Sequence, residues 1–238
     1  MRIYHTADLH DRRGIVAPLR TLRDAAPGLL FDSGDSLRGS QTMYHRDEPI
    51  IAEIDAAGYD AQAVGNREFH YLFDCLRARS ARMHHPLVCS NLLHRRHRSL
   101  PFSRSLLIGV DGSHVHVLGL LVVQYPTGSA WERVFGWQFL NPIAEVERYA
   151  KSVPDGDALI VLSHLGLRRD RELAAAVPGI TAILGGHSHD TLHEPDIVCG
   201  VPIVHAGPYG RFVSRNEFSR RDGTWQMQSS KLLPLLVA

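Results

Sequence analysis

Seven side chains able to bind metal ions follow apolar segments of this sequence. They offer carboxylate oxygens, an amide oxygen and imidazole nitrogens, and no thiolate is among them. Such a mixed oxygen and nitrogen set suits Mn, Zn, Fe, Co or Ni better than Mg or Ca. Three oxygen donors and four imidazoles suffice for two divalent ions if the ions share one carboxylate. The seven residues are Asp8, His10, Asp35, Asn66, His164, His187 and His189.

The spacing of these residues supports a common site. Asp8–His10 and His187–His189 each place two donors at positions i and i+2, which face one side of an extended backbone. Glycines precede several donors, as in Gly34 before Asp35 and Gly185–Gly186 before His187. A residue without a Cβ permits a sharp exit from a strand. We therefore expect the donors to turn into one crevice.

The elements that must position these residues alternate between short apolar runs and helical patterns, which is typical of an α/β fold. In open α/β sheets, ligands bind outside the carboxyl ends of the strands. The donors stand at such ends. The predicted strands are Ile3–Thr6, Leu29–Asp32, Ala61–Val64, Leu87–Ser90, Leu106–Val110, Val115–Val122, Ala158–Leu162, Ala182–Leu184, Ile203–Ala206, Phe212–Phe218 and Trp225–Leu232.

Helices and hairpins complete this prediction. Apolar residues at i, i+3 and i+4 predict helices around residues 15–22, 50–54 and 69–76. Asn141-Pro142 supplies a cap and a first-turn proline for a helix to about Val153, and Asp170 is expected to cap a shorter one. Turns at 110–113 and 221–223 predict antiparallel hairpins, so the sheets should be mixed.

Composition narrows the class of protein. The 238 residues form, in our interpretation, a single domain over 1–238, and the balance of 26 Lys and Arg against 25 Asp and Glu argues against a nucleic-acid partner. Cys75, Cys89 and Cys199 are too far apart for a disulfide framework. No leader or membrane-spanning run is apparent from Met1 onward, so we expect a cytoplasmic protein without a membrane partner.

The order of the motifs resembles that of the calcineurin-like metallophosphoesterases, and within them the catalytic domain of the 5′-nucleotidase and UDP-sugar hydrolase group. The resemblance covers nearly the whole chain and implies an α/β fold in which helices flank a sandwich of two mixed sheets. Its motifs are Ala7-Asp8-Leu9-His10, Asp32-Ser33-Gly34-Asp35, Gly65-Asn66-Arg67-Glu68-Phe69, Ser163-His164-Leu165-Gly166, Gly185-Gly186-His187-Ser188-His189 and Ala206-Gly207-Pro208-Tyr209-Gly210.

The resemblance also assigns roles to the seven donors. Two divalent ions in this family activate a bridging hydroxide that attacks a phosphate ester directly, without a covalent enzyme intermediate. It implies a di-metal phosphohydrolase that acts on nucleotides or similar small phosphate compounds. By resemblance, Asp8, His10 and His189 hold one ion, Asn66, His164 and His187 hold the second, and Asp35 bridges them.

One departure from the family pattern concerns catalysis. The family reads Gly-Asn-His-Glu-Phe-Asp where this chain has Arg67 and His70 in place of the His-Asp pair. Arg67 can clamp phosphate, together with Asn66, but does not donate a proton at neutral pH. We expect His70 to act as the acid instead, with its pKa lowered by the neighbouring charge of Arg67. Otherwise the site should favour leaving groups of low pKa such as phosphoanhydrides and aryl phosphates.

Two alternatives follow from the same residues. The metals could serve a phosphodiesterase or nucleotide pyrophosphohydrolase. The replaced pair could also leave a metal-binding protein with little turnover. We expect the protein to lack the C-terminal nucleotide-specificity domain found in the family's nucleotidases, so the base and ribose preference does not carry over. The sequence does not indicate an oligomeric state.

Overall fold

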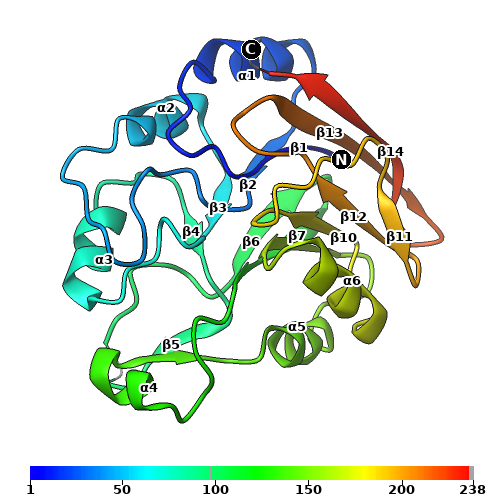
Figure 1. Cartoon of the computed structure of the whole chain (residues 1–238). Coiled ribbons are helices and arrows are strands. Elements are labelled where there is room, and N and C mark those ends of the chain that lie inside the picture. The colour runs from blue at the N-terminus through cyan, green and yellow to red at the C-terminus, as the bar shows by residue number, and fades with distance from the viewer. Residues whose placement is uncertain (97, 236–238) are drawn as a thin grey trace.

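Two six-stranded sheets face each other in the computed structural model, which describes residues 1–96 and 98–235 (Figure 1). The space between them is filled by apolar side chains from both sheets, including Ile3 and Phe31 from the first and Ile160 and Leu184 from the second. Helices cover the outer faces. The expected α/β sandwich of two mixed sheets is therefore confirmed.

The first sheet has the order β14-β13-β1-β2-β3-β4. Strands β1, β2, β3 and β4 are parallel, so their carboxyl ends lie on the same side of the sheet, while β13 pairs antiparallel with both β1 and β14. The bounds are β1 Arg2–Thr6, β2 Leu29–Asp32, β3 Ala61–Ala63, β4 Leu87–Val88, β13 Phe212–Arg221 and β14 Thr224–Pro234.

The second sheet has the order β11-β12-β10-β9-β7-β6. Strands β12, β10, β9 and β7 are parallel, and an antiparallel strand closes each edge. The bounds are β6 Leu106–Val110, β7 Ser113–Leu121, β9 Ala158–His164, β10 Ala182–Gly185, β11 Asp196–Val198 and β12 Val201–His205.

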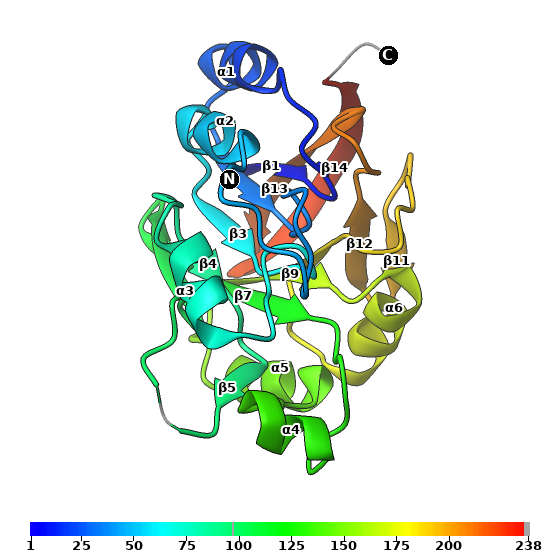
Figure 2. The same ribbon diagram turned by 60° about the vertical axis from the view of Figure 1, so that its left-hand side comes forward.

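Helices on opposite sides of the sandwich shield its two outer faces (Figures 1 and 2). The outer face of the first sheet packs against α1, α2 and α3 through residues such as Leu19, Ile54 and Leu76, and the second packs against α5 and α6. The bounds are α1 Val16–Ala25, α2 Ile50–Ala57, α3 Phe73–Ser80, α4 Ala130–Phe135, α5 Pro142–Ala150 and α6 Leu167–Ala176.

The predicted hairpins form for the expected reason. Asp111 and Gly112 join β6 to β7 with φ of 49° and 75°, and Asp222 and Gly223 join β13 to β14 with φ of 50° and 78°. Two successive residues with positive φ are the geometry of a type I′ turn, which matches the twist of paired strands. Each of these turns adds one antiparallel edge strand to its sheet, β6 to the second and β14 to the first.

Some local predictions were wrong. The helix expected around 69–76 begins only at Phe73, because Phe69 packs edge-on against the rings of Trp137 and Phe139. Asp170 lies inside the first turn of α6 and bonds to buried side chains instead of capping that helix. Helix α4 and three three-residue strands, β5 Leu92–His94, β8 Trp137–Phe139 and β11, were not predicted.

Among the described residues, no helix combines the length and the apolar character that a membrane span needs.

Candidate metal centre

The structure brings the seven predicted donors to one edge of the sandwich. Those of the N-terminal half follow the parallel strands β1, β2 and β3, and those of the C-terminal half follow or end β9 and β10. Loops from both sheets thus meet at the carboxyl ends of their strands, as expected for an α/β ligand site.

The first group of donors joins Asp8 to two imidazoles. The Nε2 atoms of His10 and His189 are 2.9 Å apart. They lie 4.0 Å and 3.8 Å, respectively, from Oδ1 of Asp8. Asp8 is buried, whereas His189 is exposed. Two imidazole nitrogens that face each other beside a carboxylate form a natural cation site, because their lone pairs repel unless a proton or a metal ion lies between them.

The second group joins Asp8, Asp35 and His164, all of them buried. Nδ1 of His164 lies 2.8 Å from the carbonyl oxygen of Ser33 and must donate to it, so in the neutral ring Nε2 carries the lone pair. That Nε2 has no hydrogen-bond donor and lies 3.2 Å from Oδ1 of Asp35. A histidine oriented in this way is arranged like a metal ligand.

The charges of this group compensate one another in the absence of a metal ion. Burial disfavours the imidazolium of His164, but the carboxylates of Asp35 and Asp8 outweigh it and raise the pKa of His164 to about 9. Burial likewise opposes ionisation of Asp35, yet His164 and two hydrogen bonds lower its pKa to about 2. The pocket therefore favours a positive charge next to Asp35.

Asn66 and His187 form the remaining part of the centre. Nδ2 of Asn66 lies 3.3 Å from Nδ1 of His187, and the ring of His187 lies edge-on to that of His164 with centroids 5.0 Å apart. The backbone N–H of His187 donates to both carboxylate oxygens of Asp8, at 3.1 Å and 3.0 Å. Asp8 thereby fixes the loop after β10 to the loop after β1.

Most of the donors have a left-handed backbone, which corrects the expectation of extended pairs. Positive φ is uncommon for residues with a Cβ and is concentrated at functional sites, although Asp and Asn tolerate it best. Gly34 shares this conformation with φ of 93°. Gly65 does not, and is needed because a Cβ there would overlap the backbone nitrogen of Asp35. The left-handed donors are Asp8 (53°), His10 (49°), Asp35 (59°), His187 (75°) and His189 (60°).

Glu68 holds two of the donor loops together. This fully buried carboxylate accepts the backbone N–H groups of Asp35 (2.8 Å) and Gly65 (2.9 Å) at Oε2, and those of Ser36 (2.9 Å) and Leu37 (3.3 Å) at Oε1. Charge-assisted hydrogen bonds of this kind are among the stronger ones in proteins. Glu68 therefore positions Asp35 and the turn that carries Asn66 at the same time.

Arg79 supports the same turn from behind. Its buried guanidinium donates to the backbone carbonyls of Arg67 (2.5 Å), Glu68 (3.0 Å) and Phe69 (3.0 Å), and also to that of Met43 (2.9 Å). Five donors in a planar group allow one arginine to bind several carbonyls. Arg79 thus ties the Asn66 turn to the loop between β2 and α2.

Arg67 lies beside the candidate centre. Its Nε is 3.9 Å from Oδ2 of Asp35, and its backbone N–H donates to Oδ1 of Asp35 at 2.8 Å. Nη1 donates to the carbonyl of Arg38 at 3.1 Å. The side chain is about one-third exposed (34%), so the guanidinium is held by a loop on one side and faces solvent on the other.

The structure does not place His70 with the donors. This imidazole is buried, and its Nδ1 accepts the backbone N–H of Leu72 at 3.0 Å. Burial and the charge of Arg79 lower the pKa of His70. The cation beside His70 is therefore Arg79 and not Arg67 as the sequence interpretation held, and the geometry gives no support to a proton-donor role for His70.

A buried polar network supports the donors of the second sheet. Ser163, which precedes His164, donates to Oδ1 of Asp170, and Oδ2 of Asp170 lies 2.8 Å from Nε2 of His205. All three are at most 1% exposed. Because they belong to β9, α6 and β12, they tie the elements around His164 together.

Two further residues at the centre escaped the sequence interpretation. Nε2 of Gln124 donates to Oδ1 of Asn66 at 2.9 Å, and nothing in the local sequence indicated that contact. Glu68 was seen only as part of a motif, because the pattern around it does not tell whether its carboxylate points inward. Tyr209, which belongs to the last of the family motifs, borders the centre: its ring lies 5.3 Å from that of His10 and 5.7 Å from that of His189.

The arrangement fits divalent metal ions. His10 Nδ1 and His164 Nε2 are buried without a hydrogen-bond partner, and two groups of donors lie with their ligand atoms within 4.8 Å of one another. Neutral imidazoles and carboxylates without thiolate are typical of sites for first-row metals. Asp8 belongs to both groups, whereas the resemblance assigned the shared position to Asp35.

Comparison with known proteins supports the resemblance. No family model matches the chain. Over 230 residues the chain is 29% identical to the uncharacterized metallophosphoesterase YunD of Bacillus subtilis. The aligned region covers 90% of this chain and 48% of YunD. The chain is 25% identical over 284 residues to a 5′-nucleotidase of Vibrio cholerae, covering 99% and 51% of the two chains. The chain thus spans about half the length of these curated relatives.

Solved structures share the fold. The 5′-nucleotidase precursor of Thermus thermophilus superposes with a TM-score of 0.80 at 23% identity, covering 99% of this chain and 54% of the other. The calcineurin-like phosphoesterase YfkN of Bacillus subtilis gives 0.73 at 20% identity, covering 98% and 89%. Homologues of this chain are therefore metallophosphoesterases and 5′-nucleotidases, and the chain has the calcineurin-like phosphoesterase fold.

Proposed function

We propose that this protein is a di-metal-dependent hydrolase of phosphate esters. The observation that carries the proposal is the convergence of Asp8, Asp35 and four histidines from both sheets, with an orphaned Nε2 of His164 beside Asp35. The homology to proteins named phosphoesterase and 5′-nucleotidase supports the same reaction class.

The donor set divides between two ions in this proposal. Asp8, His10 and His189 hold one, while Asn66, His164 and His187 hold the other, with Asp35 between them. Divalent ions at such a centre supply Lewis acidity, which activates water and stabilises the charge of an in-line displacement at phosphorus. Their identity among Mn, Zn, Fe, Co and Ni is left to experiment.

The chain's own residues orient the substrate. Arg67, one-third exposed and close to Asp35, can bind two phosphate oxygens with its guanidinium, and Asn66 offers its amide beside it. Glu68 and Arg79 hold the turn that carries both residues. Arg67 does not transfer a proton at neutral pH, and His70 accepts a backbone hydrogen bond away from the donors. The site therefore favours leaving groups that depart without protonation.

Two observations bear on the substrate. Homologues named 5′-nucleotidase favour a nucleotide or a related small phosphate compound, which is our proposal for this chain. The replaced His-Asp pair favours activated substrates, which keeps a phosphodiesterase or pyrophosphohydrolase activity as the second candidate. A cytoplasmic location and a single-domain organisation stay predictions.

The proposal is tested with p-nitrophenyl phosphate and bis-p-nitrophenyl phosphate in the presence of Mn²⁺. Turnover of the monoester that is abolished by EDTA and restored by Mn²⁺ supports the proposed function, whereas turnover of the diester alone supports the second candidate. Metal binding without hydrolysis of either compound would leave a metal-binding protein with little turnover and would refute both.

The roles of Arg67 and His70 need a separate comparison. We expect Arg67→Ala to lower kcat/KM on alkyl and aryl phosphates alike, since the guanidinium binds phosphate in both. A proton donor at His70 would make His70→Ala lose more activity on alkyl than on aryl phosphates. Wild-type rates for both variants on both substrates would exclude these residues from the reaction.

A further inference from the structure

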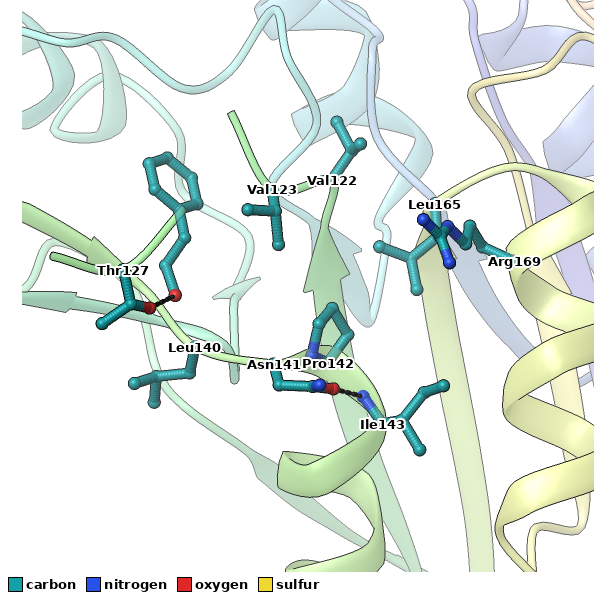
Figure 3. A pocket seen from close by; sticks show the side chains of 10 residues that line it. Val122, Val123, Thr127, Leu140, Asn141, Pro142, Ile143, Leu165 and Arg169 are labelled. Carbon is teal, nitrogen blue, oxygen red and sulfur yellow. Dashed lines mark hydrogen bonds between the residues drawn. The ribbon is translucent and has the colours of Figure 1, made fainter. Parts of the chain in front are cut away.

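A pocket of about 370 Å³ lies at the carboxyl ends of β7 and β9 (Figure 3). Its volume falls within the range of small-molecule sites, about 300–1,000 Å³. The lining comes from three segments, residues 122–127, 139–143 and 165–169. None of the seven candidate donors lines it, so it lies beside the candidate metal centre and not within it.

The pocket adjoins the candidate metal centre through its own walls. Leu121 and His164 are paired positions at the ends of β7 and β9. The next residues along each strand, Val122 and Leu165, are wall residues of the pocket. A Cβ on the following Gly166 would lie 3.6 Å from the ring of His187. The segment from His164 to Gly166 therefore borders both the candidate donors and the pocket.

The second wall is coupled to the centre as well. Val122 and Val123 precede Gln124, whose amide donates both to Oδ1 of Asn66 (2.9 Å) and to the carbonyl of Val122 (3.0 Å). A substrate with its phosphoryl group beside Asn66 would thus have its ester oxygen near the segment that forms the pocket wall.

Apolar groups make up most of the surface of the pocket. In Figure 3 the side chains of Val123, Leu165 and Pro142 surround one central space, with Leu140 and Ile143 completing the lining. Buried aliphatic surface of this kind favours an apolar ligand, because each methylene removed from water contributes about 0.8 kcal/mol. A small-molecule site combines such a surface with few polar groups.

Two polar side chains of the lining are engaged with the protein. Oγ1 of Thr127 donates to the carbonyl of Phe139 at 2.9 Å, and Oδ1 of Asn141 accepts the backbone N–H groups of Ile143 (3.0 Å) and Ala144 (3.3 Å) (Figure 3). A sugar would need many hydrogen-bond partners here, and buried hydroxyls without partners are costly. The lining therefore selects against a polyhydroxyl group.

Arg169 adds a positive charge at one side. It lies next to Leu165 in Figure 3, its side chain is 56% exposed, and its Nη1 pairs with Glu172. A partly exposed guanidinium at the side of an aliphatic pocket suits an anionic compound with an apolar body.

We propose that this pocket receives an apolar aryl or alkyl leaving group of the substrate while the phosphoryl group faces the metal centre. This assignment rests on the proposed phosphohydrolase function. It agrees with the replaced His-Asp pair, because an aryl oxide departs from phosphorus without needing a proton donor.

The test uses 1-naphthol as a probe and ¹³C-methyl-labelled Ile, Leu and Val in the full chain. We expect 1-naphthol to shift the methyl signals of Val123, Ile143 and Leu165. Ile143→Asp places a charge in the pocket at the second residue of α5, where a negative charge suits the helix N-terminus. This variant should weaken 1-naphthol binding at least about tenfold and raise KM for 1-naphthyl phosphate by a similar factor.

Val134→Asp is the matched control, because Val134 lies on α4, is 63% exposed and is not among the lining residues. It should bind 1-naphthol like the wild type. If Ile143→Asp does not fold, Val123→Asp replaces it, since Val123 is already 39% exposed.

The outcomes separate this assignment from the proposed function. Hydrolysis of phosphate esters with no methyl shift in the pocket, or with wild-type binding by a folded Ile143→Asp, overturns the pocket assignment alone. Binding of 1-naphthol without hydrolysis of any phosphate ester overturns the leaving-group role together with the proposed function. Shifts confined to the pocket and lost in Ile143→Asp, together with turnover, support both.

Discussion

The two sheets position their candidate metal donors by different means. In the second sheet, β7 and β9 pair over seven positions, and His164 is the last residue of that ladder, so the strand pairing itself fixes its place. In the first sheet, β3 has only three residues and pairs with β2 at two positions. Asp35 and Asn66 stand beyond these short strands, and their loops are held by side chains.

In the first sheet, where β2 and β3 pair at only two positions, Glu68 and Arg79 hold the donor loops by side-chain hydrogen bonds. Between them they bind four backbone N–H groups and several carbonyls of the donor loops. We therefore expect a site residue positioned by a long strand to keep its place when one neighbouring side chain is changed. A residue positioned by a buried charged side chain should lose its place when that side chain is changed. Four variants test this contrast.

The largest effect is expected for Glu68→Gln in the first sheet. The amide nitrogen cannot accept a hydrogen bond, so backbone N–H groups of the Asp35 or Gly65 loop lose their partner. We expect activity to fall about 100-fold, at the upper end of losses seen for residues that orient metal ligands. Metal affinity measured by calorimetry should fall with activity.

Glu147→Gln is the control for this variant, since Glu147 makes only an exposed ion pair with Lys151. It should keep wild-type activity. Wild-type metal affinity in Glu68→Gln would show that the donor loops hold their positions without a charged carboxylate.

Arg79→Lys is expected to have the next largest effect. A lysine has one nitrogen and cannot reach the carbonyls of Arg67, Phe69 and Met43 together, and a buried carbonyl without a partner costs about 1–3 kcal/mol. We predict a loss of a few kcal/mol in the free energy of unfolding by urea, with a smaller loss of activity than in Glu68→Gln. An unchanged urea midpoint would contradict the clamp role.

Asp170→Asn probes the second sheet with a matched loss of charge. It weakens the hydrogen bonds that Asp170 accepts from Ser163 and His205, but the ladder between β7 and β9 remains. We predict at most about a tenfold loss of activity. A loss as large as that of Glu68→Gln would remove the contrast between the two sheets. Asp196→Asn, whose carboxylate pairs with Arg171 near the surface, serves as the control.

The smallest effect on stability at neutral pH is expected for His5→Gln. His5 belongs to a chain of hydrogen bonds that links the two sheets. Its Nε2 lies 2.9 Å from Oγ of Ser33, which donates to the carbonyl of Leu184 in the second sheet. Burial, and to a lesser extent His205, lower the pKa of His5 from 6.5 to about 3. The folded state thus binds fewer protons, so His5 contributes stability above pH 6.5 that is lost as pH falls toward 3.

This contribution changes by about 1.4 kcal/mol per pH unit. Between pH 6.5 and pH 5, wild type should therefore lose about 2 kcal/mol more stability than His5→Gln, which does not titrate. Urea unfolding at the two pH values measures the difference. Parallel losses in both proteins would mean that folding does not lower the pKa of His5.

Much of the fold, and the places of the candidate donors at strand ends, could be predicted from the sequence. Strands Leu29–Asp32 and Leu106–Val110 have their predicted bounds, because their apolar runs end in turn residues. Strands of three residues, such as β5 and β8, were missed because so short a segment shows no period. The donors could be found because they stand where strands end, next to glycines.

The supporting residues could not be found in the same way. Whether Glu68 and Arg79 point inward depends on loops that approach from distant parts of the chain, and local spacing does not record such approaches. The same applies to His70, whose cationic neighbour Arg79 lies nine residues away on α3. Sequence proximity to Arg67 was therefore a poor guide to its surroundings.

The most direct test of the account is the number of metal ions held by each chain. Mn²⁺-loaded protein is passed through a desalting column, and bound manganese is measured by mass spectrometry for the wild type and for Asp35→Asn. We predict about two ions per wild-type chain, and one or fewer in the variant with the loss of phosphatase activity. A wild-type chain that retains no ion, or an Asp35→Asn chain that retains two and stays active, would contradict the account.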